Sequence, residues 1–460
     1  MLVLVLALVI QDPAAEVAAE LTTHATPRPL SAEAVTEESP GFLGAHRRPF
    51  TDERPLLKKW PEQGPKLLWE RRTGGGYAAP AIVKGRLILF HRLAGQEIVD
   101  CLDPKTGKRL WRQAAQIIYE DAFGYSNGPR CAPLIDRGQV FTYGVDGRLQ
   151  CLKLEDGKVL WKRELRKDFE SPQMFFGVGT TPLLVGEHLV VNVGSPDGPC
   201  VVAFHRDSGE TVWEAGEQWY ASYASPVFAT MEGQPRILVF GGGKSRPPVG
   251  GLSVLSPTGK LLWEFPWRSE IYYSVNAMTP VVQDSGIFIA ESYGRGGVKL
   301  ELQTDGTGKV SWKNTNFDPH FGTPVLVDEH LYGFAGQKEP TSELACVDWK
   351  SGKTLWRQDL TWEDTLTTSQ GPVQRVMHPG RAFLMRADGA FLCMGEFGHL
   401  LWLNLTPEGP KVLARARLFF ASETWTPLVV YRGLLYVCQN SRDFLTGRKQ
   451  RLLCYDFRGK

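Results

Sequence analysis

The side chains that most often perform chemistry in proteins are scattered along this chain of 460 residues. No two of its nine histidines are separated by two or four residues, spacings that bring two imidazoles to one metal ion. The sequence contains no phosphate-binding G-x-x-x-x-G-K loop and no C-x-x-C-H haem-attachment motif. It therefore predicts no catalytic residue and no metal site.

Aromatic side chains gather in the segments that lead into a series of similar Xaa-Pro pairs. Their faces, together with neighbouring asparagine and arginine side chains, suit a sugar, a peptide or a loop of another protein. The alternative is that the same rings only pack on one another and plug an opening. The candidate binding residues are Tyr77, Tyr125, Asn127, Arg130, Phe176, Tyr220, Tyr223, Tyr272, Tyr273, Asn276, His320 and Trp425.

The eight cysteines occupy positions that favour burial over reactivity. A small residue recurs ten positions before successive tryptophans, as Cys101, Cys151, Ala203, Ser253 and Cys346. Such positions in different repeats lie too far apart for a disulfide, whose Cα atoms must be within about 7 Å. The one bridge that the pattern allows joins Cys438 to Cys454.

The aromatic side chains and the cysteines recur because the chain is built from a sequence repeat. Hairpins such as LDPKTGKRLW and VDWKSGKTLW end in a tryptophan, and from Trp111 onward these tryptophans are spaced by 44 to 52 residues. That is the length of one four-stranded β-propeller blade. We expect the tryptophans to pack between neighbouring blades and to serve structure only. They are Trp69, Trp111, Trp161, Trp213, Trp263, Trp312, Trp356 and Trp402.

Each repeat also begins in a similar way, with a small residue and a proline ahead of a short apolar run, as at Ala79-Pro80 and Thr181-Pro182. Small residues fit the first strand of a blade because that strand lines the crowded axis. The seventh repeat matches least well, with only Gly371-Pro372 as its opening. The sequence predicts an all-β fold, a single eight-bladed β-propeller of four-stranded antiparallel blades, with seven blades as the alternative.

The two ends of the chain complement each other. The last repeat reaches the C-terminus without a strand that carries the repeat tryptophan. Near the N-terminus, GPKLLWE has such a strand with Trp69, but no other strands of a repeat come before it. We therefore expect an N-terminal strand around Trp69 to complete the last blade beside the strand around Tyr455. This pairing hides two sheet edges that would otherwise invite aggregation.

Three regions follow from these patterns. Residues 1–20 are expected to be a signal peptide or an apolar N-terminus. Their MLVLVLALVI run has the length of the apolar part of a signal peptide and is too short to span a bilayer. Residues 21–60 are predicted to be a linker laid on the propeller surface, and residues 61–460 the propeller. Periplasmic or secreted localisation is expected, with a cytoplasmic location if the start is misassigned. The balance of 52 Lys+Arg against 50 Asp+Glu argues against nucleic-acid partners.

The motif shared by CLDPKTGKRLW and CVDWKSGKTLW, together with KKWPEQGPKLLWE followed by GGGYAAP, resembles the PQQ-like repeat. The resemblance covers about residues 41–460 and is to the PQQ-binding-like β-propeller repeat proteins. BamB-like envelope propellers and quinoprotein alcohol dehydrogenases share this architecture. The resemblance implies the fold rather than the function, because one scaffold hosts both catalysts and binders.

Catalysis in the quinoprotein dehydrogenases, as the resemblance implies it, needs a disulfide between adjacent cysteines, a Ca²⁺ site and a catalytic aspartate. This chain has no adjacent cysteines, and its Xaa-Pro openings hold no carboxylate. No catalytic residue is therefore carried over. We expect no cofactor, with PQQ and Ca²⁺ as the alternative.

The expected function is that of a non-catalytic binding or scaffolding propeller of the bacterial cell envelope. Its aromatic channel mouth would face a protein partner, a small ligand or a glycan. One alternative is a PQQ-dependent oxidoreductase, and another is a carbohydrate- or polymer-binding module. We expect a monomer with no transmembrane span.

Overall fold

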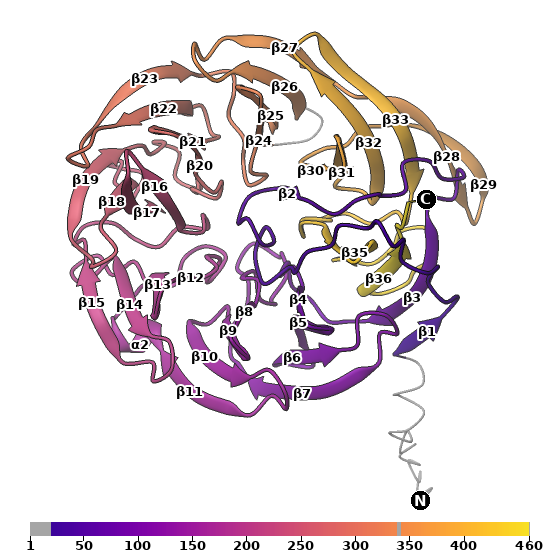
Figure 1. The fold of residues 1–460 in the computed structure, drawn as a ribbon, viewed down its shortest axis with the longest axis horizontal. Helices are drawn as coiled ribbons and strands as arrows, with labels where there is room; N and C mark the ends of the chain where they lie inside the picture. Colours follow the sequence, from indigo (N-terminus) through magenta and orange to yellow (C-terminus); the bar gives the residue numbers. More distant parts are fainter. Residues whose placement is uncertain (1–19, 338–341, 460) are drawn as a thin grey trace, which may run out of the picture.

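The computed structural model describes residues 20–337 and 342–459. These residues form eight sheets arranged as a ring, with the first strand of each sheet nearest the axis (Figure 1). The predicted all-β, eight-bladed propeller is thus confirmed, and the seven-bladed alternative is wrong. The predicted apolar N-terminus, residues 1–20, lies outside the described residues apart from Glu20. None of the helices in the described part of the chain is long and apolar enough to cross a membrane.

Blades one to three place four consecutive antiparallel strands from the axis to the rim. Blade one contains β4 (Ala81–Val83), β5 (Arg86–Leu93), β6 (Gln96–Leu102) and β7 (Arg109–Gln116). Blade two contains β8 (Leu134–Asp136), β9 (Gln139–Tyr143), β10 (Arg148–Lys153) and β11 (Val159–Glu164), followed by the helix α2 (Leu165–Asp168). Blade three contains β12 (Leu183–Val185), β13 (His188–Asn192), β14 (Val201–His205) and β15 (Thr211–Ala215).

Blades four to six repeat this order. Blade four contains β16 (Val227–Met231), β17 (Gln234–Gly241), β18 (Gly251–Leu255) and β19 (Leu261–Pro266). Blade five contains β20 (Val281–Gln283), β21 (Gly286–Glu291), β22 (Gly296–Leu302) and β23 (Gly308–Asn314). Blade six contains β24 (Val325–Val327), β25 (His330–Ala335), β26 (Glu343–Asp348) and β27 (Thr354–Gln358).

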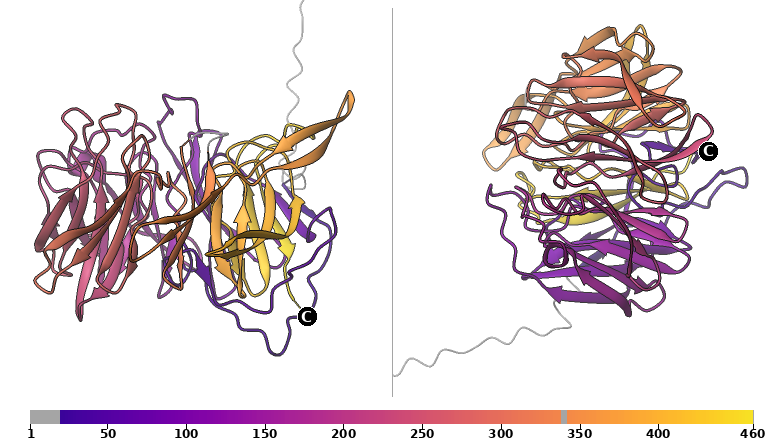
Figure 2. Two further views of the ribbon diagram at one scale, coloured as in Figure 1. Left: turned by 90° about the horizontal axis from the view of Figure 1, so that it is seen from above. Right: turned by 90° about the vertical axis from the view of Figure 1, so that its left-hand side faces the viewer.

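Blade seven departs from the sequence prediction. Its four strands are β30 (Phe383–Ala387), β31 (Ala390–Met394), β32 (His399–Thr406) and β33 (Gly409–Arg417). Gly371-Pro372 does not open this blade, because it belongs to an extra hairpin of β28 (Trp362–Thr368) and β29 (Gly371–Met377). This hairpin projects beyond the ring, as Figure 2 shows in orange.

The repeat pattern groups Trp402 with the tryptophans that end a hairpin, but its place in the blade differs from theirs. Trp402 lies on the third strand, β32, opposite Ala414 of β33. The turn in MGEFGHLLW connects the second and third strands of the blade, and so the repeat pattern is shifted by one strand here. The indole N–H of Trp402 donates to the carbonyl of Leu57 at 2.8 Å, which fixes the N-terminal segment to this blade.

Blade eight is assembled from both ends of the chain. Its strands β34 (Val429–Tyr431), β35 (Leu434–Gln439) and β36 (Arg451–Asp456) are completed by β3 (Lys66–Arg72) and edged by β1 (Leu21–Thr23). Leu67 lies opposite Tyr455, and Trp69 lies opposite Cys454. The predicted closure of the ring by the strand around Trp69 is therefore confirmed.

The outermost-strand tryptophans pack on the next blade, as predicted. The indole N–H of Trp161 donates to the carbonyl of Arg206 at 2.8 Å. Its ring lies against the turn glycine of the next blade, where a Cβ on Gly209 would approach Trp161 to 2.6 Å. Gly209 also has a φ of +73°, so this glycine supplies both the turn conformation and the space for the indole. The same contact pairs Trp69 with Gly107, Trp111 with Gly157, Trp213 with Gly259, Trp263 with Gly308 and Trp312 with Gly352.

We expect Trp161→Ala to lower the free energy of unfolding by about 3 kcal/mol, because it removes the indole between two blades and leaves a cavity. Urea denaturation followed by circular dichroism measures this loss. Leu160→Ala is the matched control, since Leu160 is 46% exposed on the same strand and should change stability by no more than about 0.5 kcal/mol. Equal stabilities of the two variants would refute the packing role.

The N-terminal segment crosses the central opening of the ring (Figure 1). Ser39 forms a β-bridge with Ile82 of blade one, and β2 (Phe50–Thr51) pairs in parallel with β30 of blade seven. Most residues of this segment are partly or fully exposed, whereas Leu43 and Leu56 are buried. A few apolar side chains of the segment therefore add to the core along the innermost strands.

All eight cysteines are free, and the pairing of Cys438 with Cys454 that the pattern allowed is not formed. Cys438 lies opposite Leu452, and Cys454 lies opposite Tyr436. Burial raises the pKa of the Cys101 thiol to about 12, so this thiol is protonated and unreactive near neutral pH.

Candidate functional site

A cavity of about 510 Å³ opens at the mouth of the ring where each outermost strand connects to the first strand of the next blade. The fold brings together most of the predicted aromatic residues here, because these connections all lie at the same end of the blades. The predicted residues that line the cavity are Tyr77, Tyr125, Arg130, Phe176, Tyr223, Tyr273, His320 and Trp425.

Four predicted residues do not line this cavity. The side-chain oxygen of Asn127 accepts the backbone N–H of Asp121 at 2.7 Å, and the side-chain amide of Asn276 donates to the carbonyl of Gly241 at 2.7 Å. Both amides are therefore used in shaping the loops. Tyr220 forms a backbone bridge with Gly242. Tyr272 is 72% exposed outside the cavity.

Several lining residues were missed by the sequence analysis. Arg381 and Phe383 enter from the start of blade seven, whose opening the repeat pattern misplaced. Phe42 comes from the N-terminal segment, and only the path of that segment through the ring could have placed it there. Phe123, Tyr293 and Gln337 are further examples from this group.

Trp425 is the centre of the aromatic lining. Its ring centroid lies 5.3 Å from that of Tyr77, 5.5 Å from that of Tyr125 and 5.6 Å from that of Phe321. The guanidinium of Arg381 lies over the Trp425 ring at 4.5 Å, within the range of a cation–π contact. The rings thus pack on one another and still enclose an open cavity.

Two arginines line the cavity, and each is held by a buried carboxylate. The guanidinium of Arg130 donates to Asp121 Oδ2 at 2.7 Å, and that of Arg381 donates to Glu396 Oε2 at 3.1 Å. Glu396 Oε1 also accepts the indole N–H of Trp425 at 2.9 Å. The positive charges of Arg130 and Arg381 are therefore compensated by Asp121 and Glu396. The contacts of Arg381 and Glu396 with Trp425 also fix the orientation of its ring.

His320 is unsuited to acid–base chemistry. Burial, with a smaller contribution from the charge of Arg381, lowers the pKa of His320 to about 3, so its imidazole is neutral at physiological pH. Its Nε2 lies 2.8 Å from the hydroxyl of Tyr293. Tyr77 donates its hydroxyl to Glu423 at 2.6 Å, and burial raises the pKa of Tyr77. The described lining residues include no carboxylate and no cysteine.

Glu97 is buried on β6 of blade one, where its Oε1 accepts the backbone N–H of Val145 of blade two at 2.8 Å. Burial raises the pKa of Glu97 to about 7. A carboxyl whose pKa is higher in the folded than in the unfolded state binds more protons when folded, so its contribution to stability falls as pH rises from about 4.3 to 7.

We therefore expect Glu97→Gln to stabilise the protein relative to the wild type at pH 8 by up to about 3 kcal/mol. The difference should shrink toward pH 5, where the wild-type carboxyl is protonated in the folded state. Chemical denaturation at several pH values measures it. A difference that does not vary with pH would contradict the assigned titration.

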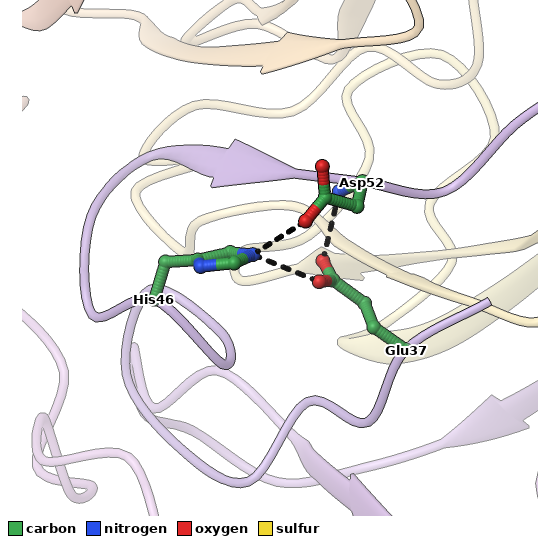
Figure 3. Close-up of side chains that lie close together, drawn as sticks. All are labelled: Glu37, His46 and Asp52. Carbon is green, nitrogen blue, oxygen red and sulfur yellow. Dashed lines mark hydrogen bonds and ion pairs between the residues drawn. The ribbon is translucent and has the colours of Figure 1, made fainter. Parts of the chain in front are cut away.

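A cluster of potential metal ligands lies in the N-terminal segment (Figure 3). His46 Nε2 is 2.9 Å from Glu37 Oε2 and 3.2 Å from Asp52 Oδ2. Glu37 Oε1 also accepts the backbone N–H of Asp52 at 3.2 Å. The spacing of these residues matches no local metal motif, and their mutual contacts form an ion-pair cluster that joins the two ends of the loop between them.

The comparisons with known proteins agree with this fold. The sequence profile of one family matches residues 95–358 and, in an overlapping second match, residues 250–459. That family is described as "Outer membrane protein assembly factor BamB". The chain belongs to this family.

One relative is the outer membrane protein assembly factor BamB of Burkholderia pseudomallei (strain K96243). It is 26% identical over 322 residues, which cover 68% of this chain and 62% of the relative. The chain thus spans less than two thirds of the length of that BamB protein.

Solved structures from two functional classes share the fold. BamB from Moraxella catarrhalis aligns with a TM-score of 0.54 and 15% identity over 83% of this chain and 95% of that one. A quinohemoprotein alcohol dehydrogenase from Comamonas testosteroni aligns with a TM-score of 0.65 and 13% identity, covering 93% of this chain and 82% of that one. At these identities the likeness concerns the fold alone.

Proposed function

We propose that this chain is a non-catalytic scaffolding propeller of the bacterial cell envelope whose aromatic mouth binds a segment of a protein partner. The observation that carries the proposal is the 510 Å³ cavity, lined by rings from separate blade connections and open at the mouth. Membership of the BamB family supports both the envelope location and a protein partner.

The chemistry of the lining favours apolar and aromatic side chains of the partner. Aromatic rings supply large contact areas at a low cost in conformational entropy, and they are typical of the central residues of protein interfaces. The two arginines already have carboxylate partners, so the cavity presents little free charge. Phe123, Tyr125 and Tyr273 are exposed at the rim and are positioned to meet the partner first.

A matched pair of double variants tests this proposal. Tyr125→Ala with Tyr273→Ala should reduce recovery of the partner from envelope extract at least tenfold, since each rim aromatic contributes about 1–2 kcal/mol. Leu160→Ala with Val212→Ala removes comparably exposed apolar groups from outermost strands and should leave recovery unchanged. Equal recovery by both double variants would reject the mouth as the binding site.

The described residues of the cavity do not fit PQQ with Ca²⁺. Calcium needs several converging carboxylate or carbonyl oxygens, yet the lining offers the Gln337 amide and no carboxylate. The nearby acids Asp121 and Glu396 already accept from Arg130 and Arg381. We therefore infer that this family member has no quinone-dependent redox site at the mouth.

Incubation with PQQ and Ca²⁺ should accordingly give no dye-linked oxidation of alcohols. The assay is run beside a quinoprotein alcohol dehydrogenase as the positive control. Stoichiometric PQQ binding together with turnover would contradict the inference and favour the oxidoreductase alternative.

A further inference from the structure

A second cavity, of about 630 Å³, lies at the other end of the central opening. Its walls are the first strands of blades four to six and the residues from His46 to Phe50 of the N-terminal segment. Phe42 of the same segment lines the aromatic cavity instead. The two cavities are therefore separate sites on opposite sides of this segment.

Three arginines line the second cavity without a carboxylate partner. Arg47, Arg48 and Arg386 form no ion pair within 4.0 Å in the described part of the chain, although Asp284 and Asp328 also line the cavity. Glu37 and Asp52 are among the acids close in sequence to Arg47 and Arg48. Both are directed at His46 instead (Figure 3).

The contacts of the three guanidinium groups leave most of their donors available. Arg47 donates to the carbonyl of Pro182 at 3.3 Å. Arg48 lies over the ring of Phe50 at 5.8 Å, and Arg386 lies over that of Phe391 at 4.8 Å. A carbonyl and an aromatic face orient a guanidinium but do not neutralise it.

The side chain of Arg47 is partly buried, and its contacts leave its charge uncompensated. Burial lowers the pKa of Arg47 to about 10, so the group still carries its charge near neutral pH. Buried charges are normally paired, because an unpaired one costs several kcal/mol of solvation free energy. An anion in the adjoining cavity would supply the missing charge.

We propose that this second cavity binds a small anion with carboxylate or phosphate groups, held by Arg47, Arg48 and Arg386. The planar guanidinium fork recognises both groups through paired hydrogen bonds. The hydroxyls of Thr279 and Thr323 belong to the same lining and add neutral donors. The volume falls within the range of small-molecule sites in proteins. The ion pairs of His46 with Glu37 and Asp52 hold the loop that carries Arg47 and Arg48.

Calorimetric titration of the full chain at low ionic strength tests the proposal, with citrate and inorganic pyrophosphate as probes. We expect one equivalent of at least one probe to bind, and Arg47→Gln with Arg48→Gln to weaken binding at least tenfold. Arg137→Gln is the control. Arg137 is 64% exposed in the turn between β8 and β9 of blade two and does not line the cavity, so this variant should leave affinity unchanged. Preference for citrate identifies a carboxylate ligand, and preference for pyrophosphate identifies a phosphate ligand.

Two results would overturn the proposal. One is the absence of binding by either probe, or equal binding by the wild type and the double variant. The other comes from thermal unfolding without any probe. Arg47→Gln should unfold at a temperature no lower than the wild type, because it removes a partly buried charge that has no carboxylate partner. A clearly lower unfolding temperature would instead show that Arg47 is a structural anchor for Pro182.

Discussion

Deletion of residues 61–72 is expected to abolish the cooperative folding of the whole ring. The deletion removes β3 and with it Leu68 and Trp69, both fully buried. Loss of two such side chains costs more than about 6 kcal/mol, which is comparable to the entire stability of a typical domain. It also exposes the backbone edge of β36 and removes Glu70, the ion-pair partner of Arg448 and Arg451.

Urea denaturation and size-exclusion chromatography measure this outcome. The control replaces residues 367–372, the end of the β28–β29 hairpin, with a short glycine–serine linker, because these residues pair only with each other and their replacement should leave the ring folded. A deletion variant that unfolds cooperatively within about 1 kcal/mol of the wild type would contradict the closure of blade eight by β3.

Asp121→Ala should cost about 3–5 kcal/mol and also disrupt the aromatic mouth. The Asp121 side chain has 0% exposure and pairs with Arg130. Its Oδ1 accepts the backbone N–H groups of Phe123 and Tyr125 at 3.0 Å and 3.2 Å. Removing the carboxylate leaves a largely buried guanidinium unpaired, which is the costly way to break such a pair. It also frees the loop that holds two rim aromatics in place.

Equilibrium unfolding and partner recovery are measured together for this variant. Asp156→Ala is the control, since Asp156 is 52% exposed in a blade turn; this variant should lose far less stability than Asp121→Ala and should leave recovery intact. Wild-type stability of Asp121→Ala would show that Arg130 does not need this carboxylate.

The repeat could be predicted because burial and turn chemistry recur at each blade. The outermost-strand tryptophan and the turn glycine of the next blade form one physical contact, so their spacing in the sequence reports blade length directly. Blade seven lacks this pair: Ala414 stands opposite Trp402. Because the pattern is shifted by one strand in blade seven, the sequence did not reveal where the first strand of this blade begins, and Arg381 just before that strand was missed.

The candidate site was only partly predictable for a different reason. The side chains just before each Xaa-Pro pair reach one mouth because the topology repeats, which placed Tyr77, Tyr125 and Trp425 correctly. Whether such a residue faces the cavity or braces a loop depends on local hydrogen bonds, as at Asn127 and Asn276. Phe42 could not be placed, because no periodic pattern describes the segment that crosses the ring.

Site-specific photo-cross-linking in the native envelope tests the proposed function most directly. A benzophenone amino acid is introduced at Phe123, which is 50% exposed at the rim of the mouth, or at Leu160, which is 46% exposed on an outermost strand. The account predicts a discrete adduct with one envelope protein from position 123 and none from position 160. The absence of an adduct from position 123, or the same adduct from both positions, would contradict a partner bound at the aromatic mouth.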